Sequence, residues 1–327
     1  MSTKQTFKYK SCAKAAKAGD LNELKNMREN GRKWDWETPA SAAENGHLEC
    51  LKYAHQNGCN WHYSTTLRAA ENGHLECLKY AHENGCRWAQ GTTAYAALNG
   101  HLHCLKYAYE NGCPWNFNTP AHAAYNGHLE CLKYAHENGC PWDEWIPKSA
   151  ALNGHLECLK YAHENGCKWD DWIPANASKN GHLECLQYAH EQGCEWDIET
   201  AIGAAENGHL KCLKYCFENG LKFTIVLPKY AAENGNLECF KYCFQVWDDQ
   251  QKFWNHEYDL SKIIHKIDLD DPLWRKLFTL DLNKYPKLQS KVNSKKQEIE
   301  TLKAASKDAL QNLLPMDVIK YCLQPFF

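Results

Sequence analysis

Residues 126–140 read Asn-Gly-His-Leu-Glu-Cys-Leu-Lys-Tyr-Ala-His-Glu-Asn-Gly-Cys, and nearly the same fifteen residues return along the chain at a fixed interval. Nine copies cover roughly residues 8 to 246, and a degenerate first copy opens at Gly19. Such self-similarity is typical of a solenoid, in which each repeat buries its apolar face against its neighbours. The turn glycine recurs with a fixed period of 27, at Gly46, Gly73, Gly100, Gly127, Gly154, Gly181, Gly208 and Gly235.

Each repeat is predicted to form two helices. Thr38–Glu44 is expected to be a short first helix that Thr38 caps and that has Pro39 at its first helical position, where no amide donor is missed. Asn45-Gly46 ends it, and a second helix runs from Leu48 to Asn57 before Gly58 stops it. The unit is therefore a helix-turn-helix, and the fold class is all-α.

Composition limits the possible partners. The 327 residues carry a net charge of -3, with acidic and basic side chains interspersed, so the sequence predicts no nucleic-acid footprint and no basic membrane patch. The segment Met1–Lys10 lacks the apolar core of a signal peptide, and no later window is long and apolar enough to cross a membrane. We expect the chain in the cytosol or the nucleus.

The cysteines follow the repeat. Fourteen of the 18 lie at two repeat positions, which are those of Cys50 and Cys59. A periodic cysteine in a chain without a leader behaves as a small buried hydrophobe, so we expect free, packed thiols.

The core of the repeat resembles the ankyrin repeat. Ala42-Ala-Glu-Asn-Gly-His-Leu-Glu-Cys-Leu-Lys-Tyr53 is similar to that family's Ala-Ala-x-x-Gly-His-x-x-Val-Val-x-Leu. The period is shorter than the usual 33, and the residues missing between Gly58 and Thr65 imply a hairpin curtailed to a tight loop. The near-identical copies also resemble the expanded ankyrin arrays of large DNA viruses and protists, and a viral origin would place the protein in the host cell.

A tryptophan recurs in each shortened loop. Stacked one repeat apart, these rings are expected to form a ladder that closes one edge of the core, and the alternative is an aromatic strip that binds a ligand. The positions are Trp34, Trp61, Trp88, Trp115, Trp142, Trp169 and Trp196, with Phe223 in the next copy.

Three segments are predicted along the chain. Residues 1–34 form an N-terminal capping repeat, because Glu23, Asn26 and Arg32 put polar groups where later copies have apolar ones. Residues 35–246 hold the repeats of period 27. Residues 247–327 form a helical C-terminal cap or tail.

No catalytic centre is expected. His47, Cys50, His55 and Cys59 recur together, but Cys50 and His55 are five positions apart and point to different faces of a helix, which argues against zinc. An enzyme needs one asymmetric pocket, whereas these residues return in equivalent copies. The sequence therefore predicts no catalytic residue, no metal and no cofactor.

Variation between copies marks a binding surface. The fifteen-residue core hardly changes, while the residues after each loop tryptophan differ. The resemblance to ankyrin repeats implies that the loop and the outward side of the first helix line a concave face that binds a protein partner. We expect the chain to be a monomer. Aromatic and arginine anchors are favoured at such interfaces. The candidate partner-binding residues are Trp36, Tyr63, Arg68, Tyr95, Phe117, His122, Trp145, Asn176 and Tyr230.

The C-terminal segment suggests a rival function. Leu-Pro followed by an acid and an amphipathic helix resembles the opening of an F-box, which implies docking on the linker subunit of a cullin ubiquitin ligase and a role as substrate adaptor. A plain C-terminal cap explains the same apolar residues, and a third hypothesis is an architectural component of a larger assembly. The docking residues would be Leu314, Pro315, Val318, Ile319, Cys322 and Leu323.

Overall fold

The computed structural model describes residues 7–224, 226–234, 236, 238–243 and 246. Every regular element in this part of the chain is a helix, which confirms the all-α prediction. The first helices of the repeats are α1 (Cys12–Lys17), α3 (Thr38–Glu44), α5 (Thr65–Glu71), α7 (Thr92–Leu98), α9 (Thr119–Tyr125), α11 (Trp145–Asn153), α13 (Trp172–Lys179), α15 (Ile198–Asn207) and α17 (Leu227–Glu233). The second helices are α2 (Leu21–Glu29), α4 (Leu48–Gln56), α6 (Leu75–Glu83), α8 (Leu102–Glu110), α10 (Leu129–Glu137), α12 (Leu156–Glu164), α14 (Leu183–Glu191) and α16 (Leu210–Glu218).

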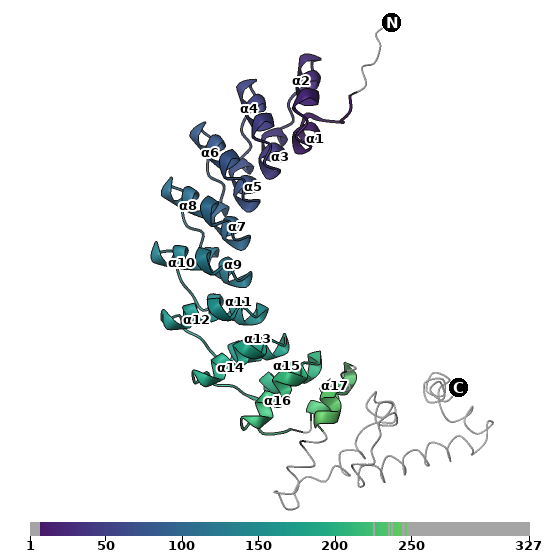
Figure 1. The fold of residues 1–327 in the computed structure, drawn as a ribbon, viewed down its shortest axis with the longest axis vertical. Coiled ribbons are helices and arrows are strands. Elements are labelled where there is room, and N and C mark those ends of the chain that lie inside the picture. Colours follow the sequence, from purple (N-terminus) through teal and green to yellow (C-terminus); the bar gives the residue numbers. More distant parts are fainter. Residues whose placement is uncertain (1–6, 225, 235, 237, 244–245, 247–327) are drawn as a thin grey trace, which may run out of the picture. The chain divides into compact units, whose positions relative to one another are not determined.

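The chain divides into two compact units. One comprises Met1–Ala177 with Glu184–Glu195, and the other Ser178–Leu183 with Trp196–Phe327. From α1 to α11 each first helix packs on the neighbouring first helix and on its own second helix, and Figure 1 shows these two helix types on opposite sides of the stack. In the second unit α15 packs on α16 and α17. The segment boundaries expected after residues 34 and 246 stay predictions.

The helix starts differ from expectation in one respect. Thr38 does not cap its helix: the N-cap is Glu37, Thr38 is the first helical residue, and Pro39 follows it. The Thr38 side chain is buried instead, and its Oγ1 has no hydrogen-bond partner among the described residues. Thr92 shows a second use of this position, because its Oγ1 donates to the carbonyl of Ala89 at 2.8 Å. Threonine therefore fills space between repeats where the sequence suggested a cap.

The core is thin and built from small side chains. The alanine pair of the first helix is fully buried in α1, α3, α5, α7, α9, α11 and α15, as at Ala42 and Ala43, so neighbouring helices approach closely. In the second helix Cys50, Leu51 and Ala54 face inward. Each repeat thus contributes one layer, and the core grows by repetition instead of by thickening.

The described cysteines are free and buried, as the repeat pattern predicted. Burial raises the pKa of Cys131 to about 12, so this thiol stays protonated. The cysteine that follows the second helix ties two repeats together: Cys86 Sγ donates to the carbonyl of His62 at 3.6 Å, and Cys140 Sγ donates to that of Asn116 at the same distance. These thiols act as packed donors and not as reactive groups.

The loop tryptophans form a ladder, but not the expected one. Trp61 does not stack on another tryptophan: it lies flat on His55 of its own repeat, with ring centroids 4.4 Å apart, and meets the edge of Tyr80 in the next repeat. Its Nε1 donates to the carbonyl of Asn84 at 2.8 Å, beyond the end of the next second helix. The ladder is thus mixed, because histidine and tyrosine fill the spacing between repeats that indole rings alone would leave open.

The turn glycine and the histidine after it belong to one joint between repeats. Gly73 has a φ of +74°, and the ring of His101 from the next repeat lies directly over its Cα. Burial lowers the pKa of His101, and the imidazoles of His128 and His74 lower it further, while a hydrogen bond with the backbone of Glu71 opposes them. Neutral imidazole is therefore the form that this joint holds.

Acidification should loosen this joint, and His101→Asn should reduce the effect. Since the pKa of His101 is lower in the folded chain than its unfolded value of 6.5, the unfolded chain takes up the proton first. The stability is complete above about pH 6.5 and is lost as the pH falls below it towards the folded pKa. We expect the thermal midpoint of the variant to fall less steeply over this range.

A later repeat of the chain already has asparagine at the position of His101. Asn236 occupies the same register in a later repeat, where its Nδ2 donates to the carbonyl of Ala205 at 3.0 Å. Asparagine can therefore fill this position without a titrating group. Equal slopes of midpoint against pH in the variant and the natural chain would contradict the assignment.

Candidate protein-binding surface

The predicted partner-binding residues fall into two groups. Arg68, Tyr95, His122, Asn176 and Tyr230 share one register in the middle of the first helix, and we call them the first-helix row. The others lie at or beside the loop tip, where the chain enters the first helix, and we call them the loop-tip residues; they are Trp36, Tyr63, Phe117 and Trp145. Tyr230 lies in the second compact unit and the rest in the first.

The loop-tip residues are among the most exposed apolar side chains of the first unit. Their exposed fractions are 64% for Trp36, 74% for Tyr63, 65% for Phe117 and 62% for Trp145. A tight turn presents them: the Asp143 carboxylate accepts a hydrogen bond from the backbone N–H of Trp145 at 3.0 Å. An exposed aromatic side chain on a tightly held loop would lose little conformational entropy on binding.

Two loop tips share an aromatic cluster. The ring of His62 lies 4.4 Å from that of Trp36 and 4.3 Å from that of Tyr63, and its Nδ1 lies 2.6 Å from Ser64 Oγ. Burial lowers the pKa of His62, and the charge of Arg68 adds to the effect. The cluster therefore favours a neutral imidazole between two aromatic rings.

The first-helix row carries different types of side chain in successive repeats. Tyr95 and His122 meet edge to face, with ring centroids 6.3 Å apart. Asn176 has interactions of its own within the structure. The middle of the row therefore presents aromatic surface.

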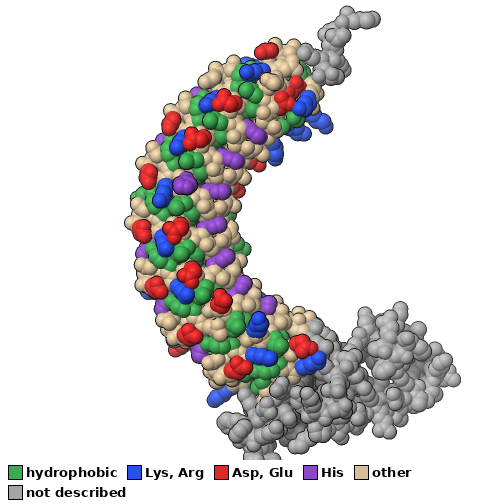
Figure 2. Space-filling model, viewed as in Figure 1, with side chains coloured by type: hydrophobic (Ala, Val, Ile, Leu, Met, Phe, Trp, Pro, Cys, Tyr) green, Lys and Arg blue, Asp and Glu red, His purple; other side chains and the backbone are tan. Residues whose placement is uncertain are grey.

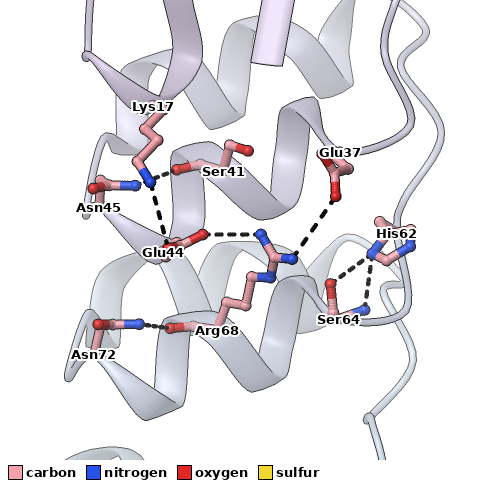
Figure 3. Close-up of polar contacts among 9 residues, drawn as sticks. All are labelled: Lys17, Glu37, Ser41, Glu44, Asn45, His62, Ser64, Arg68 and Asn72. Atoms are coloured by element: carbon pink, nitrogen blue, oxygen red, sulfur yellow. Dashed lines mark hydrogen bonds and ion pairs between the residues drawn. The ribbon is translucent and has the colours of Figure 1, made fainter. Parts of the chain in front are cut away.

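Arg68 is already paired. Its guanidinium lies 2.9 Å from the Glu44 carboxylate on α3 and 3.9 Å from Glu37 in the preceding loop (Figure 3). Glu44 also lies 3.9 Å from the Lys17 ammonium, which belongs to α1. Only 30% of the Arg68 side chain is exposed. Arg68 therefore links neighbouring repeats, and a partner would have to compete with two internal carboxylates for its charge.

The sequence prediction missed four exposed apolar residues, one of which, Val226, lies in the second unit. Trp172 is 62% exposed and stands one repeat after Trp145, so the period alone could have found it. Tyr125 and Leu152 are exposed at the C-terminal end of their first helices. Tyr125 comes three positions after His122 and so lies on the same helix face, a signal that choosing one residue per copy overlooked.

The second helices present a different surface. Glu76 and Lys79 pair at 3.0 Å, and Glu130 and Lys133 do the same two repeats later. Figure 2 shows acidic and basic side chains recurring together along the repeats. We call these repeated pairs the second-helix ridge. Because its charges satisfy each other and face water, it offers little binding energy.

The described residues carry no sign of metal or membrane chemistry. No group of three or more histidine, cysteine, aspartate or glutamate side chains in this part of the chain could hold a metal ion. No helix among the same residues is long and apolar enough to cross a bilayer. The F-box-like segment, with Leu314, Pro315, Val318, Ile319, Cys322 and Leu323, lies outside the described residues.

Comparison with known proteins identifies the repeats. A family model described as ankyrin repeats (3 copies) matches residues 39–118, and one described as ankyrin repeats (many copies) matches residues 121–163 and 148–190. No curated protein matches the chain. Among solved structures, the human ASB11 ankyrin repeat domain is similar at 21% identity and a TM-score of 0.43, covering 48% of this chain and 84% of that one. With two family models matching successive stretches, the repeats between residues 39 and 190 belong to the ankyrin repeat family.

Proposed function

We propose that this chain is a non-catalytic module that binds a protein partner on the loop-tip residues and the aromatic middle of the first-helix row. Ankyrin repeats are in general protein–protein interaction modules. The observation that carries the proposal is the exposure of Trp36, Tyr63, Phe117 and Trp145. Large aromatic side chains held in water at positions that differ from copy to copy are typical of interface anchors.

The rest of the repeat supports this choice by contrast. The second-helix ridge repeats the same ion pair in several repeats, as at Glu76–Lys79 and Glu130–Lys133, and so distinguishes few of them from one another. The turn side is occupied by the glycine–histidine joints. The variable, aromatic surface remains as the part of the repeat that can give specificity.

Site-specific cross-linking tests the proposal in the protein's own cell. A photoreactive phenylalanine analogue would replace Tyr63, Tyr95 or Phe117, and Lys79 on the ridge would receive the same group as the matched control. We expect one partner to be captured from the first three positions and not from Lys79. Alanine at a true anchor should then weaken binding of that partner about 30-fold, since anchors contribute at least about 2 kcal/mol.

The ridge gives the opposing variant. Glu76→Ala with Lys79→Ala should leave the affinity within about twofold, because an exposed ion pair contributes little. Loss of binding in this double variant, with normal binding by the aromatic variants, would place the interface on the second helices and refute the proposal.

Two more specific roles would use further parts of the chain. A substrate adaptor for ubiquitin ligation would use the same surface for its substrate and the segment Leu314–Leu323 for a cullin linker subunit, and its basis is sequence resemblance alone. An architectural role in a larger assembly would use the second-helix ridge. We also propose that the chain acts as a monomer in a reducing compartment such as the cytosol or nucleus, which the free, buried thiols favour.

A further inference from the structure

One lysine of the first unit lies next to two carboxylates and an indole ring. The Lys148 ammonium is 3.0 Å from the Asp170 carboxylate and 3.8 Å from that of Glu144. It also lies over the ring of Trp145, 5.5 Å from the centroid. Only 15% of the Lys148 side chain is exposed. Two carboxylates from successive loops and one indole face thus hold a single positive charge.

The next repeat carries the tryptophan and the adjacent loop carboxylate of this site without the lysine. Asp171-Trp172 stands in the register of Glu144-Trp145, and in the register of Lys148 this repeat has Ala175. The loop is built the same way: the backbone N–H of Trp172 donates to the Asp170 carboxylate at 3.2 Å, as that of Trp145 donates to Asp143. Trp172 is as exposed as Trp145, at 62%.

No internal cation replaces the missing one. Among the described residues, Lys148 is the basic side chain that pairs with these loops, and it serves Glu144 and Asp170. Asp171 is exposed and forms no ion pair within the described part of the chain. The two loops together hold four carboxylates, of Asp143, Glu144, Asp170 and Asp171, against two positive charges, that of Lys148 and that of Lys168 in the second loop.

We infer that Trp172 and Asp171 form a second copy of the site that Lys148 fills, one without a lysine of its own, and that this copy takes a lysine or arginine side chain from a basic segment of the partner. The inference rests on the proposed function and states the chemistry of the partner. A cation over an indole face is attracted by the ring quadrupole, and the excess of carboxylates draws basic segments towards the loops. Arginine is favoured over lysine, because a guanidinium is weakly hydrated and stacks on aromatic rings.

The chain offers a variant that closes the site from within. Ala175→Lys places a lysine in the register of Lys148 and leaves Trp172 in place. The matched control is Ala121→Lys, which adds the same charge at the same position of a repeat whose loop has Asn118 instead of tryptophan. Lys148→Ala tests the opposite change, because it removes the lysine from the first copy.

Binding of a short fluorescein-labelled peptide that alternates arginine with glycine and serine, followed by anisotropy on the full chain, tests the inference. We expect Ala175→Lys and Trp172→Ala each to weaken binding about fivefold, since a cation on an exposed indole contributes up to about that factor. Ala121→Lys should stay within about twofold of the natural chain. Lys148→Ala should bind more tightly, and added salt should weaken every complex.

Several results would overturn the inference. They are no binding of the arginine peptide by the natural chain, equal binding of a glutamate peptide, or an unchanged affinity in Ala175→Lys. If cross-links at Tyr63, Tyr95 and Phe117 still capture a partner in that case, the proposed function stands and only the basic chemistry fails. If neither the peptide nor the cross-links find a partner, both proposals fail.

Discussion

Alanine at Gly73 should destabilise the chain by about 3 kcal/mol, whereas alanine at Gly139 should cost only about 1 kcal/mol. The two glycines have nearly the same backbone, with φ of +74° and +75°. The strain of placing a side chain in the left-handed region is therefore common to both variants. The expected difference comes from what the added methyl group meets.

At Gly73 the new Cβ would lie 2.6 Å from Nδ1 of His101 and 2.7 Å from its Cε1. At Gly139 nothing lies within 4 Å of the same atom. The imidazole cannot move away freely, because it is packed at the joint between two repeats. Overpacking of this kind costs typically about 1 to 3 kcal/mol beyond the strain.

Urea denaturation followed by circular dichroism measures both variants, and a double-mutant cycle isolates the clash. In Gly73→Ala with His101→Ala, the cost of the first change should fall to that of Gly139→Ala, because the ring is gone. Equal midpoints for the two glycine variants would show that the joint adapts, and would remove the histidine from the explanation.

The sequence predicts the helices of this chain well, because their limits are set locally. The glycine at each turn and the acid in the first turn of the second helix are signals within one repeat. Thr38–Glu44 is found where it was expected, and the second helix ends at Gln56, just before the expected Asn57. Local signals fail at Thr38, which does not cap its helix and whose hydroxyl is buried without a hydrogen-bond partner among the described residues.

The candidate surface is harder to predict, because its side chains meet partners one repeat away. Arg68 looked like a free anchor, yet Glu44 of the preceding repeat already binds it. The cation site of Lys148 likewise needs Asp170 from the following loop. The period of the sequence shows which positions are equivalent, but only the stacking of the helices shows which of them touch.

Two tryptophans three residues apart should separate stability from binding. Trp142 lies flat on His136, with centroids 4.1 Å apart, and meets the edge of Tyr161 in the next repeat. Trp145, which enters the following helix, is 62% exposed. Trp142→Ala should lower the free energy of unfolding by about 2 to 3 kcal/mol, because it removes a half-buried ring from the ladder. Trp145→Ala should change it by no more than about 0.5 kcal/mol.

Partner binding should show the reverse order. We expect Trp145→Ala to weaken binding of the cross-linked partner about 30-fold. Trp142→Ala, measured under conditions in which it is folded, should bind within a few fold of the natural chain. Isothermal calorimetry with urea denaturation on the same samples gives both quantities. If Trp145→Ala unfolds the chain or Trp142→Ala alone abolishes binding, the two roles are assigned to the wrong rings.

Phenylalanine at the ladder positions refines the test. The Nε1 of Trp142 is buried without a hydrogen-bond partner among the described residues, whereas that of Trp115 donates to the carbonyl of Asn138 at 3.0 Å. Trp142→Phe keeps a stacked ring and removes an unpaired polar group, while Trp115→Phe removes one of the two donors to the carbonyl of Asn138, which keeps the hydrogen bond from the Tyr109 hydroxyl at 3.1 Å. Trp115→Phe should therefore cost about 1 kcal/mol more than Trp142→Phe, as expected for one lost hydrogen bond. Equal costs would mean that ring packing alone, and not the indole donor, holds successive repeats together at this edge.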